Sequence, residues 1–181
     1  MLSKPIENLD RLRAILGTSQ PPVSREGFAF SLLKPGIPRG AITEISGSPG
    51  SGKSEVVLKF LAETSPSLRV AWIEEDFTIY PCALPPAGVD LSRVLFSHAG
   101  SRASWSTHQI LRSQLFGVVV LNAFIREEVE LRRLQLAAEK SQTSLILLSE
   151  TPRLAGNWPI QLQIRVARDP DTRRCLLEVL R

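Results

Sequence analysis

The chain has 181 residues, of which 43% are hydrophobic, and its formal net charge at pH 7 is +4. This length favours a single domain, and the hydrophobic fraction is sufficient for a buried core. No apolar run reaches the roughly 18 residues that a membrane-spanning helix needs, and the N-terminus lacks the apolar stretch of a signal peptide. We therefore expect a cytoplasmic protein that does not enter the membrane.

Positive charge gathers in the last part of the sequence. Residues 151–181 contain six arginines and only three acidic residues. A basic end can contact nucleic acid or an acidic protein, but arginines on the solvent-exposed face of a strand pair give the same composition. Composition leaves both interpretations open.

The two cysteines, Cys82 and Cys175, lack the spacing of metal ligands. We expect buried free thiols rather than a disulfide, as in a reducing compartment.

The first part of the chain is predicted to form a terminal segment over residues 1–30, with the main domain over residues 31–181. Apolar residues at helical spacing predict a short helix over Glu7–Leu16, followed by a proline-containing linker. Phe28–Leu33 is predicted as a short strand. A turn is expected after it, from the run of Pro35, Gly36, Pro38 and Gly40.

Strands and helices then alternate. The expected strands are Ala41–Ser46, Arg69–Glu74, Arg93–Ser97, Gly117–Leu121 and Ser144–Leu148. The expected helices are Ser54–Glu63, Thr107–Leu115 and Arg126–Lys140. The two late strands are continuously apolar, as central strands of a parallel sheet are. The alternation predicts an α/β fold whose mostly parallel sheet is covered by helices on both faces.

The C-terminal segment has a different pattern. Ile160–Val166 and Cys175–Leu180 alternate apolar and polar residues, and the segment between them contains Asp169, Pro170 and Asp171. These are turn-forming residues, so we expect an antiparallel hairpin at the end of the sheet.

The segment Gly47–Ser54, with the sequence GSPGSGKS, matches the phosphate-loop pattern G-x-x-x-x-G-K-[ST] between a predicted strand and a predicted helix. Glycines let backbone N–H groups wrap around phosphate oxygens, and the helix presents its positive end to the same anion. Lys53 is expected to contact the β- and γ-phosphates, and the Ser54 hydroxyl to bind Mg²⁺. The predicted nucleotide contacts in this loop are Gly47, Ser48, Pro49, Gly50, Ser51, Gly52, Lys53 and Ser54.

Two long segments resemble the RecA family. LKPGIPRGAITEISGSPGSGKSEVVLKFLAE is similar to the family's phosphate-loop region, and RVAWIEEDFTIYPCALPPAGVDLSRVLFSHA to the stretch that follows it. The resemblance covers roughly residues 30–181. It implies a RecA-like P-loop NTPase core that uses ATP and Mg²⁺.

Three positions depart from the family pattern. Asp76 stands where the resemblance implies a catalytic glutamate, with Glu75 beside it as a substitute; a solvated strand end over 74–76 is the other interpretation. Asn122 replaces the magnesium-binding aspartate, and Glu150 replaces the glutamine that senses the γ-phosphate. An asparagine brings no charge and a carboxylate repels a triphosphate, so we expect weak Mg²⁺ binding and slow hydrolysis.

The segments that correspond to DNA-contacting loops are short, with room for one helix between Asn122 and Ser144. The C-terminal run WPIQLQIRVARDPDTRRCLLEVLR resembles the end of ImuA-type proteins, which are RecA-like and are sometimes grouped with SulA-like cell-division inhibitors. That resemblance implies an accessory role in DNA-damage tolerance, within the SOS response and translesion synthesis. It implies partners among the proteins of an error-prone polymerase cassette and RecA, and weak ATP binding or slow hydrolysis.

The alternative function is an active DNA-dependent ATPase or recombination motor that uses Asp76 or Glu75. A small-molecule P-loop kinase is less well supported, because the late arginines lie in the predicted hairpin and not in a lid. The basic hairpin is the candidate DNA contact.

Overall fold

The structure is a computed structural model that describes residues 27–181, so the helix predicted over Glu7–Leu16 lies outside the described residues. One sheet has the strand order β5-β4-β6-β7-β3-β8-β9, and only the β8–β9 pair in it is antiparallel. This confirms the predicted α/β fold with a C-terminal hairpin. The strands are β3 (Ile42–Ser46), β4 (Val70–Glu74), β5 (Val94–His98), β6 (Val118–Asn122), β7 (Ser144–Ser149), β8 (Leu162–Arg168) and β9 (Cys175–Val179).

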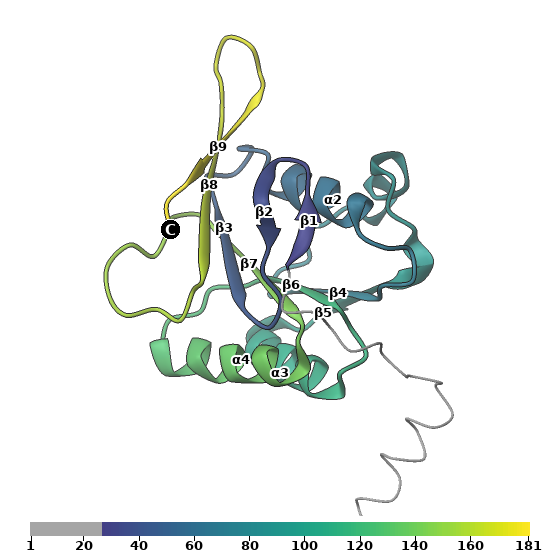
Figure 1. Ribbon diagram of the computed structural model, residues 1–181, viewed down its shortest axis with the longest axis vertical. Helices are drawn as coiled ribbons and strands as arrows, with labels where there is room; N and C mark the ends of the chain where they lie inside the picture. Colours follow the sequence, from purple (N-terminus) through teal and green to yellow (C-terminus); the bar gives the residue numbers. More distant parts are fainter. Residues whose placement is uncertain (1–26) are drawn as a thin grey trace, which may run out of the picture.

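Helices cover the sheet on both faces (Figure 1). α2 (Lys53–Glu63) lies on one face, whereas α3 (Ala103–Ser113) and α4 (Glu128–Ser141) pack against each other on the opposite face. The first turn of α3 was missed by the prediction, which began at Thr107. Four short 3-10 turns connect the elements around β5, at Pro81–Ala83, Pro85–Ala87, Leu91–Arg93 and Gly100–Arg102.

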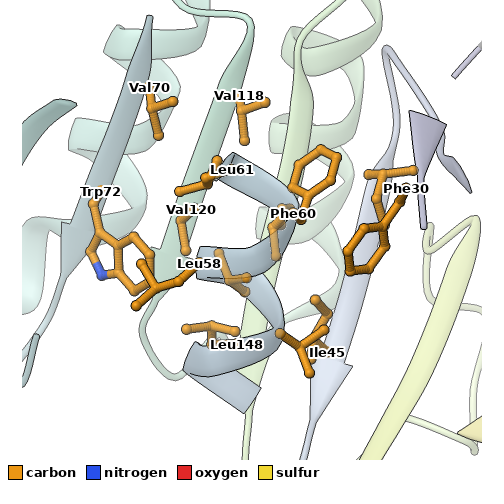
Figure 2. Packing of buried hydrophobic residues seen from close by; sticks show 14 of the residues in the cluster. Phe30, Ile45, Leu58, Phe60, Leu61, Val70, Trp72, Val118, Val120 and Leu148 are labelled. Carbon is orange, nitrogen blue, oxygen red and sulfur yellow. The ribbon is translucent and has the colours of Figure 1, made fainter. Parts of the chain in front are cut away.

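The core divides into two layers because successive side chains of a strand point to opposite faces. On β4, Trp72 packs with the α2 cluster that contains Phe60 and Leu61 (Figure 2). Its neighbour Ile73 packs with the cluster beneath α3 and α4, which contains Leu111 and Leu131. β4, β6 and β7 are therefore mainly apolar, with side chains buried on both faces.

A second, two-stranded sheet joins β1 (Phe28–Phe30) to β2 (Leu33–Ile37). The turn predicted over residues 35–40 is wrong at its start, since β2 continues through Gly36. That glycine has a φ of +117°, and a Cβ there would collide with the Phe28 carbonyl oxygen, so only glycine fits the strand at this point. The Phe30 ring packs edge-on against Phe60 of α2, with centroids 5.5 Å apart, and the expected boundary between residues 30 and 31 falls inside this hairpin.

The C-terminal end of α2 is held by a buried arginine. Arg93 donates hydrogen bonds to Thr64 Oγ1 at 3.1 Å, to the Ser65 carbonyl at 2.9 Å and to the Leu61 carbonyl. The last carbonyls of a helix have no partner within it, and here the Leu61 carbonyl of α2 accepts from both Thr64 and Arg93, while Arg93 also holds the two residues that follow the helix. No helix within residues 27–181 is long and apolar enough to cross a bilayer.

Candidate nucleotide-binding site

The phosphate loop runs from the end of β3 to the start of α2. The Gly47 amide donates to the Ser149 carbonyl of β7 at 3.1 Å, which fixes the start of the loop. Gly52 precedes α2 with a φ of +95°, and no side chain caps the helix. The first N–H groups of α2 are therefore open to an anion, where the helix dipole favours negative charge.

The Lys53 side chain folds back toward the start of the phosphate loop. Its ammonium donates to the Gly47 carbonyl at 2.9 Å and to the Ser149 carbonyl at 3.2 Å. Burial lowers the pKa of Lys53, and the nearby Glu150 carboxylate opposes that shift. A bound phosphate would offer this ammonium a charged partner in place of two carbonyls.

A cavity of about 1070 Å³ opens above the loop and the ends of the parallel strands. Its lining includes most of the predicted site residues, which are Pro49, Gly50, Gly52, Lys53, Ser54, Glu75, Asp76, Asn122 and Glu150. The other loop residues, Gly47, Ser48 and Ser51, do not line it. Ligands of open α/β sheets bind at this edge, outside the carboxyl ends of the strands.

The two candidate catalytic acids differ in their surroundings. Glu75 is half-buried and accepts a hydrogen bond from the Phe124 amide at 3.1 Å. Asp76 is exposed and has no hydrogen bond or ion pair with any residue in 27–181. Both line the cavity. Asp76 is thus the acid whose oxygens are open to a water or a ligand.

The sequence interpretation missed Glu74, which appeared only within one of the two interpretations of residues 74–76, a solvated strand end. Its carboxylate is buried and accepts bonds from Trp72 Nε1 at 3.0 Å, from Thr78 N at 2.5 Å, from Thr78 Oγ1 at 3.1 Å and from Ile79 N at 2.9 Å. The solvated interpretation does not hold for Glu74, because the amides of Thr78 and Ile79 in the turn after β4 donate to its carboxylate. Trp72, two residues earlier on the same face of the strand, was the available signal.

Asn122 joins this network at the position of the expected magnesium-binding aspartate. Its amide nitrogen donates to Glu74 Oε1 at 3.2 Å and to Thr78 Oγ1 at 3.1 Å. The amide oxygen is left to accept a hydrogen bond, for example from metal-bound water. Within the described residues, no group of three or more His, Cys, Asp and Glu side chains is placed to hold a metal ion.

A second unpredicted network lies under the end of β7. Glu44 of β3 is fully buried and forms an ion pair with Arg153 at 2.5 Å; it also accepts from Ser149 at 3.0 Å and from Gln163 at 2.8 Å. Arg153 stacks over the Trp158 ring at 5.3 Å. These contacts fix the segment after β7 that carries Glu150. Glu44 and Arg153 are more than 100 residues apart in sequence, so no local sequence pattern indicates that they pair.

The C-terminal hairpin also reaches the phosphate loop. Arg168 donates to the Gly50 carbonyl at 3.3 Å and pairs with Glu55 of α2 at 2.9 Å. Cys175, opposite Arg168 in the hairpin, is half-buried, and burial raises the pKa of its thiol. Both cysteines are free; the prediction of buried thiols is wrong for Cys82, which is exposed, and Cys175 is only half-buried.

The fold and the loop define a class of protein, a RecA-like α/β core with a phosphate loop after β3. The structure resembles the crystal structure of the RadB recombinase with a TM-score of 0.63, over 88% of this chain and 90% of that chain, at 17% identity. At that identity the likeness concerns the fold alone.

Sequence comparison gives the same relationship. The chain is 35% identical to the RecA protein of Symbiobacterium thermophilum over 91 residues, which cover 49% of this chain and 26% of that protein. It is 28% identical to RecA of Rhizobium leguminosarum bv. trifolii over 149 residues, which cover 68% of this chain and 41% of that protein. The matched regions thus span between about a quarter and two fifths of those relatives. No family model matches the chain. The two likenesses together support a RecA-like relationship.

Proposed function

We propose that this chain is a RecA-like accessory protein of DNA-damage tolerance that binds ATP weakly or hydrolyses it slowly and acts through protein partners. The observation that carries the proposal is the pairing of a complete phosphate loop with Asn122, whose amide is hydrogen-bonded to the buried Glu74. A complete phosphate-loop motif supports phosphate binding, whereas the end of β6, where the resemblance implies a magnesium-binding aspartate, carries an amide.

In this proposal the loop residues hold the phosphates. The N–H groups of the loop and of the first turn of α2 donate to phosphate oxygens, and Lys53 turns from its two carbonyl partners to the phosphates. RecA-like NTPases generally use Mg²⁺ with ATP; here Ser54 would ligate it and Asn122 would accept from its water. Because Asn122 is neutral, Mg²⁺ contributes less to affinity and to turnover than in a site with an aspartate.

The accessory role rests on the short segments around the site. Only α4 stands between β6 and β7, and a short segment connects β7 to β8. Little chain is available there to contact DNA. Together with the likeness of the C-terminal run to ImuA-type proteins, this favours partners among error-prone polymerase cassette proteins and RecA, in translesion synthesis during the SOS response.

Calorimetric titration of the purified chain with ATP, with and without Mg²⁺, tests the proposal, with Lys53→Ala as the matched control. We expect binding that Mg²⁺ changes by less than about tenfold and that Lys53→Ala weakens by about a hundredfold or more. Strong DNA-stimulated ATPase activity in the isolated chain would rule the accessory role out.

The second candidate is an active ATPase, which the position of Asp76 favours, since this exposed carboxylate lines the same cavity as Lys53. If Asp76 orients the attacking water, Asp76→Asn abolishes turnover and leaves ATP affinity intact. Equal turnover in the two proteins would exclude this role for Asp76.

A further inference from the structure

The turn of the C-terminal hairpin starts beside the phosphate loop, at Arg168 and Cys175. Arg168 closes β8 and pairs in register with Cys175, the first residue of β9. Between them, the Asp169 carboxylate accepts from the Asp171 and Thr172 amides, both at 2.8 Å. These two bonds keep the pKa of Asp169 below its ordinary value. The hairpin therefore presents Arg168 from a defined turn.

The Arg168 guanidinium lies against the loop at its glycines. Its Nε donates to the Gly50 carbonyl at 3.3 Å, and its Nη1 donates to the Arg173 carbonyl at 2.9 Å. A Cβ built on Gly52 would lie 3.0 Å from Arg168 Nη2. The guanidinium thus stands next to the backbone that is shaped to receive phosphate, and it lines the same cavity as Lys53.

The remaining partner of Arg168 is the carboxylate of Glu55, in the first turn of α2. Nη2 pairs with Glu55 Oε2 at 2.9 Å, and the two side chains are 35% and 68% exposed. Exposed ion pairs are worth little, so this pair breaks readily. A triphosphate presents several charged oxygens, and a guanidinium binds such oxygens with two parallel donors.

We propose that Arg168 is a ligand of the bound nucleotide, and that its guanidinium leaves Glu55 for a phosphate oxygen when the loop is occupied. This inference rests on the proposed nucleotide binding and extends it to the hairpin. Because Asn122 is neutral, Mg²⁺ is expected to bind weakly. Arg168 of the same chain then supplies part of the positive charge that the phosphates need. Nucleotide occupancy is thereby coupled to the position of the basic hairpin.

The direction in which two substitutions change ATP affinity separates this role from a structural one. Arg168→Gln removes the phosphate ligand, and we expect ATP affinity to fall about tenfold. Glu55→Gln releases Arg168 and removes a negative charge beside the loop, so affinity should rise about threefold. If the ion pair only braced the loop, both substitutions would break the same brace and both would weaken binding.

The experiment is calorimetric titration with ATP of the wild type and of the variants Arg168→Gln, Arg168→Lys, Glu55→Gln and Lys53→Ala. Arg165→Gln is the matched control, since Arg165 lies on the same strand but pairs with the exposed Glu178 at 3.0 Å, and it should stay within about twofold of wild type. Arg168→Lys keeps the charge without the fork and should bind with intermediate affinity.

A fall in ATP affinity in Arg168→Gln together with a rise in Glu55→Gln supports the proposal. Unchanged affinity in Arg168→Gln, with binding lost in Lys53→Ala, overturns it and leaves the proposed nucleotide binding intact. A fall of similar size in both Arg168→Gln and Glu55→Gln also overturns it, in favour of a brace. Absence of ATP binding in the wild type overturns this proposal together with the proposed function.

Discussion

The two sides of the cavity above the phosphate loop differ in the chemical groups they present. On one side, the phosphate loop offers backbone N–H groups and Lys53 to an anion. On the other, the ends of β4 and β6 carry Glu74 and Asn122, which are bonded to each other. Phosphate binding relies mainly on the backbone, whereas metal binding and hydrolysis depend on single carboxylates. One side of such a site can therefore be altered while the other is kept, so under the proposed function nucleotide binding and turnover are separable.

The largest effect is expected in the buried network around Glu44, under the end of β7. Glu44→Gln leaves Arg153 without its charge partner in a nearly enclosed position, and we expect a loss of about 3 kcal/mol in the free energy of unfolding. Urea denaturation measures it. The matched control is Glu178→Gln, which breaks the exposed pair with Arg165 and should cost less than about 0.5 kcal/mol. Equal small losses would mean that the buried Glu44–Arg153 pair does not stabilise the segment after β7.

A second test restores a carboxylate at the strand end. Asn122→Asp places a second negative charge beside the buried Glu74, and we expect a destabilisation of roughly 2 kcal/mol. The double variant Glu74→Gln with Asn122→Asp exchanges amide and carboxylate, so it should regain about half of that loss or more. It should also make ATP binding depend on Mg²⁺ by about tenfold. Additive losses in the double variant would show that the two side chains are not coupled.

A smaller effect is expected at Thr78, whose hydroxyl donates to Glu74 and accepts from Asn122. Thr78→Ala should lower the free energy of unfolding by about 1 kcal/mol, because a buried carboxylate loses a donor. Thr78→Ser keeps the hydroxyl and should recover most of this loss. Thermal unfolding of the three proteins decides whether the hydroxyl or the methyl group matters.

The smallest effect concerns the phosphate-loop side. Because burial raises the pKa of Cys175, less thiolate forms there at a given pH, and iodoacetamide should modify Cys175 roughly threefold more slowly than the exposed Cys82 at pH 8. The difference should shrink as the pH rises toward the raised pKa. Mass spectrometry of the two peptides measures both rates, with the unfolded protein in urea as the reference. Equal rates in the folded protein would indicate that the hairpin does not stay on the loop.

Much of the fold was predictable because it follows from short-range patterns. Apolar runs predicted β6 and β7, and alternation predicted the hairpin of β8 and β9. Boundaries moved where capping was irregular: α3 begins at Ala103 after a 3-10 turn, four residues before the predicted start. The turn predicted over 35–40 was wrong at Gly36, because the hairpin with β1 needs an extended strand there, and that partner is not local.

The sequence by itself determined the phosphate-loop motif and most of the alternation of strands and helices, and the resemblance to the RecA family singled out Asp76, Asn122 and Glu150. These features are local, since a loop motif, an amphipathic pattern or a residue type can be recognised from the sequence without knowing which residues lie nearby in space. Only the tertiary structure decided that Glu74 is buried and that Glu44 pairs with Arg153, and only the structure brought Arg168 to the loop. Each of those contacts joins side chains whose proximity is created by the sheet order, and burial in the assembled core is what gives a carboxylate its partners.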